Sequence, residues 1–201
     1  MNFKMGTLRI VVLSIVCFLP SLALANSCSV TTVDSLLGTT CSIGDVSFAF
    51  SANSFSGSGI SASSLVFTPD GSNPVDPSFT LTGPLSISTT GLGTSTGLGF
   101  SFFWNATVTN SQLQFGSAAN TLINANVPDS PSNGYVAAGN NHGIPTFTNA
   151  LVQSGGPDSN PSTALIDQTS FLDGIFAGLF VEDGTGNGAT ASVDPCNTNM
   201  I

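Results

Sequence analysis

The chain has 201 residues, eleven of them Asp or Glu and only two Lys or Arg, with a formal net charge of −9 at neutral pH. The two basic residues are Lys4 and Arg9, so residues 26–201 hold all eleven acids, no Lys or Arg, and a formal charge of −11 with His142 neutral. This composition excludes nucleic-acid binding, because Lys and Arg are the residues that neutralise phosphates. An anionic membrane surface would also repel the chain.

The first 25 residues are typical of a secretory signal peptide. Lys4 and Arg9 form a basic start, residues 10–19 an apolar centre, and residues 23–25 (Ala-Leu-Ala) a small-residue cleavage site. Cleavage between Ala25 and Asn26 would leave one secreted domain, residues 26–201. The apolar centre is too short for a comfortable membrane span, although an N-terminal anchor is the alternative interpretation. We therefore expect a protein outside the cell or at its surface, with no membrane span after cleavage.

Three cysteines follow the cleavage site, namely Cys28, Cys41 and Cys196. Export favours disulfide formation, and Cys28 and Cys41 are close enough in sequence to close a small loop before the first strand. By the loop-entropy model, this disulfide would stabilise the fold by about 3 kcal/mol. Cys196 has three open alternatives: a bond to another chain, a free thiol, or replacement of one of the other two cysteines.

Short apolar runs separated by turn residues predict a succession of strands in the first half of the domain. The runs lie at residues 46–50, 65–67, 79–81 and 85–87. Residues 51–64 are rich in Gly and Ser and predict a connection, and residues 88–97 predict a flexible link. The sequence Pro69-Asp70-Gly71 is a strong turn signal.

The most regular pattern lies between Leu98 and Thr109 (LGFSFFWNATVT). Apolar residues at every second position, including Trp104, predict one buried face of an extended strand. Phe103 is the only apolar residue on the opposite side. We interpret this stretch as the central core strand, with the shorter apolar runs packed around it.

The next residues predict a more irregular region. Leu113 and Phe115 suggest a hairpin partner of the central strand, and Leu122 with Ile123 suggests another strand. Residues 124–143 are polar and rich in Pro and Gly, which favours a long surface loop. A further strand is predicted over residues 144–151, followed by a plain loop at residues 155–161.

The stretch 165–181 fits two patterns. Six apolar residues recur at helical spacing: Phe171, Leu172, Ile175, Phe176, Leu179 and Phe180. Against a helix, Gly174 and Gly178 would each cost about 1 kcal/mol. Residues 175–181 also alternate, and we favour strands, followed by a hairpin loop at residues 182–188 into a strand at 189–193. We therefore predict an all-β fold: a single antiparallel β-sandwich, jelly-roll or immunoglobulin-like, with long Gly/Ser/Pro-rich loops.

Several features resemble the exported bacterial β-rich proteins that usually carry a C-terminal PEP-CTERM sorting tail. The resemblance lies in Cys28, the run from Leu36 to Phe48 (LLGTTCSIGDVSF), residues 79–84 (FTLTGP), residues 106–109 (ATVT) and the Gly-rich segment before residues 189–192 (ATAS). It implies export and a surface or matrix role, with no common chemistry. The sequence ends at residues 194–201 (DPCNTNMI) without the Pro-Glu-Pro motif, membrane helix and basic tail. A missing tail and a released protein both remain open.

One motif suggests catalysis. Gly93-Thr94-Ser95-Thr96-Gly97 matches the G-x-S-x-G nucleophile pattern, and Asp129 and His142 follow in the order that an α/β-hydrolase uses. That chemistry needs a strand, a sharp turn and a helix, whereas Gly97 leads directly into the predicted central strand. We therefore assign no catalytic residue and expect a protein that is not an enzyme.

A metal site is the other candidate. Glu182, Asp183 and Asn187 could offer oxygen ligands to Ca²⁺, although the segment lacks the length and the closing Glu of an EF-hand loop. A solvated turn is the alternative, and we expect no other cofactor. The leading functional hypothesis is a non-enzymatic structural protein of the cell surface or extracellular matrix. A carbohydrate- or calcium-binding adhesin module is the second hypothesis and a secreted hydrolase the third, with surface polysaccharide or a second copy of the chain as the expected partner.

Overall fold

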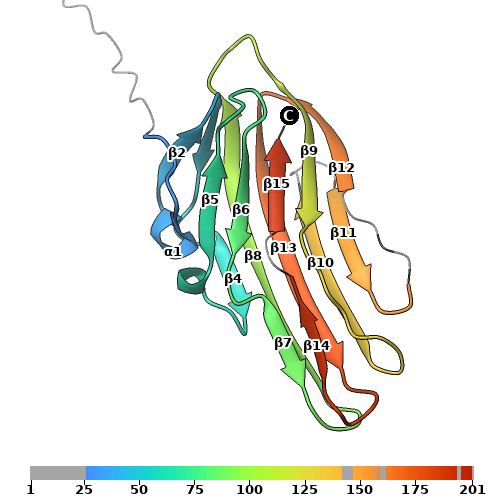
Figure 1. The fold of residues 1–201 in the computed structure, drawn as a ribbon. Helices are drawn as coiled ribbons and strands as arrows, with labels where there is room; N and C mark the ends of the chain where they lie inside the picture. The colour runs from blue at the N-terminus through green and yellow to red at the C-terminus, as the bar shows by residue number, and fades with distance from the viewer. Residues whose placement is uncertain (1–25, 142–146, 157, 159–161, 194–195, 201) are drawn as a thin grey trace, which may run out of the picture.

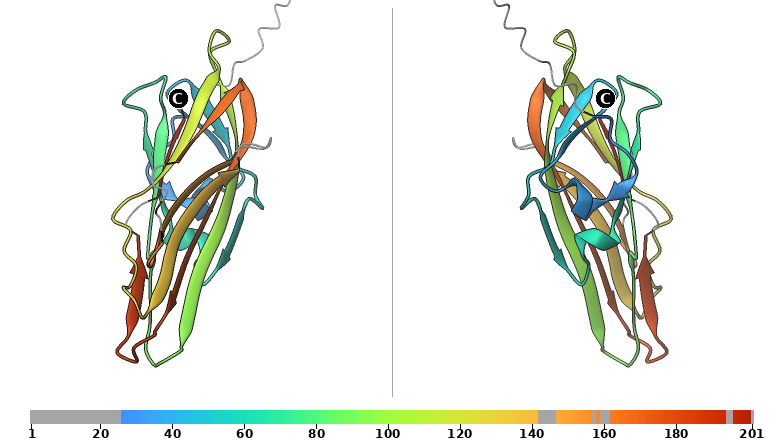
Figure 2. Two further views of the ribbon diagram at one scale, coloured as in Figure 1. Left: turned by 90° about the vertical axis from the view of Figure 1, so that its right-hand side faces the viewer. Right: turned by 90° about the vertical axis from the view of Figure 1, so that its left-hand side faces the viewer.

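The structure is a computed structural model that describes residues 26–141, 147–156, 158, 162–193 and 196–200. These residues form a β-sandwich in which two large antiparallel sheets pack face to face, with a small third sheet at one end (Figures 1 and 2). The predicted all-β sandwich is confirmed, while the jelly-roll and immunoglobulin-like alternatives stay predictions. The predicted signal peptide, its last residue Ala25 and His142 lie outside the described residues.

The larger sheet has seven strands. Their order is β11 (Phe147–Gln153), β10 (Asn133–Asn141), β13 (Ser170–Glu182), β8 (Ser95–Val108), β3 (Val46–Ala49) and β2 (Thr40–Ile43), and β4 (Phe55–Ser58) also pairs with β8. The long strands β8 and β13 form its centre and, with β10 beside β13, reach the lower end of the molecule (Figure 1).

The opposite sheet has six strands. Their order is β1 (Thr31–Thr32), β5 (Val66–Asp70), β6 (Ser78–Thr82), β15 (Cys196–Met200), β9 (Phe115–Leu122) and β12 (Ser162–Gln168). The third sheet pairs β7 (Ser86–Thr89) with β14 (Ala189–Ser192) and lies against the extended ends of β8 and β13. The helical segments are one short α-helix, α1 (Val33–Leu36), and one 3₁₀ turn, η1 (Ala62–Ser64), among the described residues.

The central strand is confirmed as β8, and its even-numbered residues point into the sandwich. Trp104 is only 1% exposed, and its ring meets that of Phe79 from the opposite sheet edge-on, with centroids 5.1 Å apart. Phe102 and Phe50 stack parallel to one another within the same core at 5.3 Å. Close aromatic packing of this kind adds to the hydrophobic stabilisation from burial alone.

The ambiguous stretch 165–181 forms strands rather than a helix. Ile175, Leu179 and Val181 are buried on the inner face of β13, and β13 pairs with β8 along its whole length, from Ser170 opposite Thr107 to Glu182 opposite Ser95. The extended partner strand decides the conformation, and the apolar residues at helical spacing are therefore divided between the two faces of the sheet.

The prediction of a surface loop over residues 124–143 is wrong for its second half. β10 begins at Asn133 and pairs with β11 on one side and β13 on the other. Its sequence (NGYVAAGNN) has few of the β-branched residues that favour strands. Val136 and Ala138 are nevertheless buried on the inner face, where small side chains leave space for Asn120 of the opposite sheet to donate a 2.9 Å hydrogen bond to the Ala138 carbonyl.

Two predicted hairpins are also wrong, because both connections cross from one sheet to another. The strand that contains Phe115 is β9, which pairs with β12 and β15 in the six-stranded sheet and not with β8. Residues 182–188 lead from β13 to β14, which pairs with β7. The predicted connection over residues 51–64 also contains β4 and η1. Turn residues mark where a strand ends but carry no information about which sheet the chain enters next.

The predicted disulfide is confirmed: Cys28 and Cys41 are bonded, with their Cα atoms 4.9 Å apart. Cys41 lies in β2, so the bond ties the start of the domain to the edge strand of the larger sheet. Cys196 begins β15, where its backbone pairs with Leu81 and Leu122, two buried residues. The state of its thiol stays a prediction.

Candidate functional site

The outer face of the seven-stranded sheet carries an unusual number of apolar side chains. We define the outer face by the residues of β8, β10 and β13 that point away from the core. Six large or polar side chains dominate it: Phe103 and Asn105 from β8, Leu172, Phe176 and Phe180 from β13, and Tyr135 from β10. An exposed apolar patch on a monomer is commonly a binding surface.

One aromatic pair on this face joins β10 to β13. Tyr135 and Phe180 are directly opposite each other in the strand pairing, and their rings stack with centroids 5.7 Å apart and planes 18° apart. Tyr135 is 42% exposed. The pair therefore offers a broad, partly exposed aromatic surface near the lower end of the sheet.

A second aromatic pair joins β8 to β13. The rings of Phe103 and Phe176 meet edge-on, with centroids 5.1 Å apart and planes 80° apart. Phe176 is 43% exposed. Phe103 lies opposite Gly174, and a Cβ at Gly174 would overlap the Phe103 ring. The absence of a side chain at 174 is what lets this ring lie flat on the sheet.

Small residues separate the two aromatic pairs. Gly178 lies between Phe176 and Phe180 on β13, and its cross-strand partners are Ala137 on β10 and Gly99 on β8. Towards β4, a shallow open depression is lined by Ser56, Ser58, Gly99, Ser101 and Phe176, among others. The outer face thus has small residues between its aromatic pairs and a shallow depression beside Phe176.

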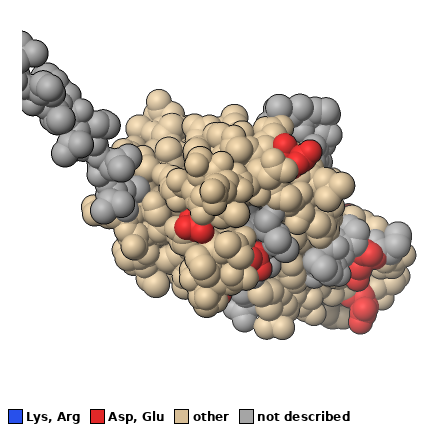
Figure 3. All heavy atoms as spheres, turned by 90° about the horizontal axis from the view of Figure 1, so that it is seen from above, with Lys and Arg blue, Asp and Glu red and all other residues tan. Residues whose placement is uncertain are grey.

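The outer face is almost free of charge. Among the described residues of β8, β10 and β13, Glu182 is the single ionisable group that points outward, apart from the phenol of Tyr135. The view from above, onto the upper end of the sandwich, shows a few acidic side chains and no Lys or Arg on the described surface (Figure 3). Neutral hydrogen-bonding side chains share this face, such as Ser101 opposite Phe176 and Asn105 opposite Leu172.

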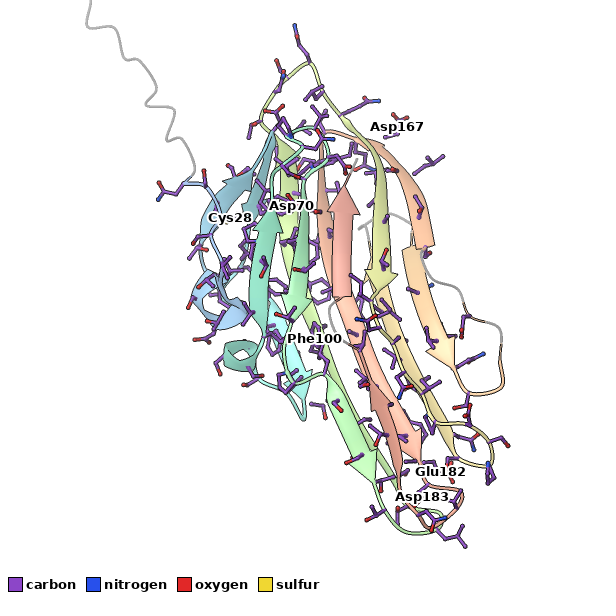
Figure 4. The ribbon with its side chains drawn as sticks, in the orientation of Figure 1. Cys28, Asp70, Phe100, Asp167, Glu182 and Asp183 are labelled. Atoms are coloured by element: carbon purple, nitrogen blue, oxygen red, sulfur yellow. A yellow bond between two sulfur atoms is a disulfide. The ribbon has the colours of Figure 1, made fainter. Side chains whose placement is uncertain are left out.

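Asp183, the central residue of the predicted calcium site, accepts hydrogen bonds from protein groups in the structure. Asp183 is fully buried at the lower end of the molecule, next to Glu182 (Figure 4). Its Oδ1 accepts hydrogen bonds from the N–H groups of Thr185 and Gly186 and from the Thr185 hydroxyl. Its Oδ2 accepts from the N–H groups of Gly91 and Gly188, all five bonds being 2.9 Å long. Both carboxylate oxygens therefore already face protein donors.

These donors also determine the protonation of Asp183. Burial of the carboxylate raises its pKa, but hydrogen bonds from the N–H of Thr185, the N–H of Gly188, the Thr185 hydroxyl and the N–H of Gly186 together outweigh burial and lower the pKa well below the ordinary value of 3.8. Asp183 is therefore ionised at neutral pH and acts as an anchor between the loop at residues 90–94 and the loop at residues 183–188.

The calcium interpretation of Glu182, Asp183 and Asn187 stays a prediction that this geometry does not favour. No group of three or more His, Cys, Asp or Glu side chains that could hold a metal ion occurs among the described residues. Asp70 and Asp167 lie at the opposite end of the sandwich from Asp183 (Figure 4), so the acids do not gather around one centre.

The hydrolase motif lies in a context unlike that of a nucleophile elbow. Ser95 is the first residue of β8, is exposed, and pairs with Glu182 across the sheet. An elbow places its serine on a sharp turn between a strand and a helix, whereas β8 continues for 14 residues. His142 lies outside the described residues, so the proposed triad with Asp129 stays a prediction without a described geometry.

Sequence reasoning missed the aromatic face, although two signals for it were present. Phe103 was the one apolar residue on the polar side of the central strand. Phe176 and Phe180 have the opposite parity to Ile175 and Leu179, so any strand that buries the second pair must expose the first. These signals become informative only after residues 165–181 are known to be extended.

No family model matches the chain, and no curated protein matches it. The resemblance to the PEP-CTERM-associated proteins therefore stays a prediction. Within the part of the chain that the structure describes, no helix has both the length and the apolar character needed to cross a membrane.

Proposed function

We propose that the protein is a secreted, non-catalytic component of the cell surface or extracellular matrix that binds neutral polysaccharide through the outer face of its larger sheet. The observation that carries this proposal is the pair of aromatic clusters, Tyr135 with Phe180 and Phe103 with Phe176, on a sheet face whose described residues include one acid and no base. Export is supported by the signal-like residues 1–25, and the Cys28–Cys41 disulfide is compatible with an oxidising compartment.

The chemistry of the face matches that of a sugar ring. A pyranose presents a flat array of C–H groups on its faces and hydroxyl groups around its edge, so it can pack on an aromatic ring while its hydroxyls bond to neutral polar groups. Binding sites for small molecules generally combine aromatic surface with a few polar groups that fix orientation. Here the rings are those of Tyr135 and Phe176, and the side chain of Ser101, which lies directly opposite Phe176, is a neutral polar group beside them.

Charge restricts the class of polysaccharide. Residues 26–201 contain eleven acids and no Lys or Arg, and Glu182 lies on the outer face itself. An anionic polymer would find no cation to pair with, and its charges would be repelled by those of the protein. Neutral polysaccharides are therefore favoured over alginate- or pectate-like chains.

Affinity gel electrophoresis of the purified protein, with its disulfide intact, tests the proposal. The gels would contain hydroxyethylcellulose, galactomannan, dextran or pullulan as neutral polymers, and alginate or polygalacturonate as anionic ones. We expect retardation by at least one neutral polymer and by neither anionic polymer. Wild-type mobility that no neutral polymer changes would show the proposal to be wrong.

Variants locate the binding surface. Tyr135→Ala and Phe176→Ala each remove one exposed ring, and the loss of about 1.4 kcal/mol of stacking and burial corresponds to about tenfold weaker retention. Leu165→Ala is the matched control, because Leu165 is an exposed apolar residue on β12 of the other sheet. Equal retention of all three variants would place binding somewhere other than the outer face.

A further inference from the structure

We propose that the bound polysaccharide crosses the strands rather than following them, and that the protein takes an internal stretch of a linear, uncharged chain. The path is a trough whose floor is Ala137, Gly178 and Gly99 and whose walls are Phe176 and Phe180. This inference rests on the proposed function, since it specifies how the outer face holds its ligand.

The strand pairing sets the floor of the trough. Ala137 is opposite Leu151 of β11 and Gly178 of β13, and Gly178 is opposite Gly99, which is opposite Ser58 of β4. These five residues form one row perpendicular to the strands. At a spacing of about 4.8 Å between neighbouring strands, the row is about 19 Å long.

The aromatic residues form the walls on either side of this row. Phe176 and Phe180 each lie two residues from Gly178 on the same face of β13, so their Cα atoms are about 14 Å apart along the strand. Tyr135 stacks beside Phe180 and Phe103 packs beside Phe176, which extends each wall across a second strand. A sugar chain lying along the row would have a ring on each side of it.

The floor of the trough has room for a ligand at Gly178. A Cβ at Gly178 would have one neighbour within 4 Å, the carbonyl oxygen of Leu98 at 3.7 Å, so a Cβ atom fits above the backbone at this position without a clash. Gly178 does not have the positive φ that would exclude other residues. The depression beside Ser56, Ser58 and Phe176 continues this open space towards β4.

Among the described residues, the row reaches Leu151 on one side of the sheet and Ser58 on the other. One end is at β11, the last strand of the larger sheet, and the other is at β4, which pairs with β8. A pocket that is closed at one end would select the terminus of a chain, whereas a trough open at both ends accepts any internal stretch. The single acid on this face, Glu182, lies opposite Ser95 and Asn133, one row beyond the wall formed by Phe180 and Tyr135.

Gly178→Leu is the decisive variant, because it fills the floor while it leaves every aromatic ring in place. Thr163→Leu is the matched control, since it adds the same side chain to an exposed strand position on β12 of the opposite sheet. The probe is the neutral polymer of the four above that retards the wild-type protein most. Thermal unfolding of each variant reports whether the fold is intact, and Ser58→Phe at the β4 end of the trough replaces Gly178→Leu if that variant does not fold.

We expect at least tenfold weaker retention for Gly178→Leu and wild-type retention for Thr163→Leu. Calorimetry with oligosaccharides of the same polymer should give an affinity that rises with length and then reaches a plateau, and chemical reduction of the sugar at the chain end should leave the affinity of long oligomers unchanged. If Phe176→Ala loses binding but folded Gly178→Leu and Ser58→Phe keep it, the crossing trough is wrong and the proposed function stands. If the wild-type protein binds no neutral polymer, or uses the outer face to dimerise instead, both are wrong.

Discussion

The ring of Phe103 lies over Gly174, its direct partner in the pairing of β8 with β13. A Cβ at position 174 would overlap Cδ1 and Cε1 of that ring, so glycine is the residue that lets the ring lie on the backbone. A glycine in a strand interior normally weakens the strand, and the covering aromatic ring compensates by excluding water from the exposed backbone. The same placement brings Phe103 into edge-on contact with Phe176.

Gly174→Ala should therefore destabilise the protein and disturb the outer face. The added methyl group must displace the Phe103 ring, and overpacking of this kind costs about 1–3 kcal/mol. Urea unfolding would measure the cost, and polysaccharide retention would measure the effect on the face. Gly178→Ala is the matched control for stability, because it lies on the same face of the same strand where a Cβ has open space. Equal urea midpoints for the two variants would contradict the packing described here.

Asp183→Asn should lower the melting temperature by several degrees, although it changes a single oxygen to a nitrogen. The two oxygens of Asp183 accept five hydrogen bonds, and an amide would turn an N–H₂ group towards two or three of these donors. Asp70→Asn is the control, because Asp70 is an exposed turn residue that accepts a hydrogen bond from the Ser72 N–H. If Asp183→Asn melts at the same temperature as Asp70→Asn or higher, Asp183 does not anchor the two loops.

The stability of the protein should also fall with acid through Asp183. Because its pKa is lowered in the folded state, the carboxylate stabilises the fold at pH values above the ordinary value of 3.8. This stabilisation is lost as the pH falls below that value towards the lowered pKa. The difference in melting temperature between wild-type protein and Asp183→Asn should therefore be constant from pH 7 to pH 5 and shrink below pH 4. A difference that grows with acid would have the wrong sign.

Local patterns in the sequence predicted the parts of the fold that depend on local physics. Alternation between Leu98 and Val108 identified β8 and the burial of Trp104, because one strand with one buried face leaves a period of two. The pair Cys28 and Cys41 was predictable because only a short loop separates the two residues. The turn at residues 69–71 was predicted from Pro, Asp and Gly, but β5 continues to Asp70 before the chain turns.

The remaining features depend on contacts between residues far apart in the sequence. β10 is held between two strands, β11 and β13, and its Gly- and Ala-rich sequence carries no strand signal of its own. Asp183 is identified as an anchor by the N–H of Gly91, a residue 92 positions away. The aromatic face requires the register of β10, β13 and β8, since Tyr135, Phe180 and Gly97 are brought side by side by pairing alone.

Removal of the disulfide should destabilise the protein without changing its fold. The bond closes a loop between residues 13 positions apart, and constraint of a loop of this size in the unfolded chain is worth about 3 kcal/mol. The double variant Cys28→Ala with Cys41→Ala, compared with wild-type protein in urea with and without reductant, measures this contribution. Reductant should lower the midpoint of the wild-type protein but not that of the double variant. A double variant as stable as oxidised wild-type protein would show that the bond contributes nothing.

Trp104 provides a test of the core, because its indole Nε1 is buried and has no hydrogen-bond partner among the described residues. A buried unpaired N–H costs about 1–3 kcal/mol, while loss of a whole buried Trp side chain costs about 3–5 kcal/mol. Trp104→Ala should therefore be strongly destabilising. Trp104→Phe should cost less than about 2 kcal/mol, because it keeps a ring against Phe79 and removes the unpaired donor.

Urea unfolding followed by circular dichroism measures both variants, with Phe79→Leu as a control that removes ring atoms but no polar group. A Trp104→Phe variant as destabilised as Trp104→Ala would contradict the expectation that removal of the unpaired donor offsets the smaller ring.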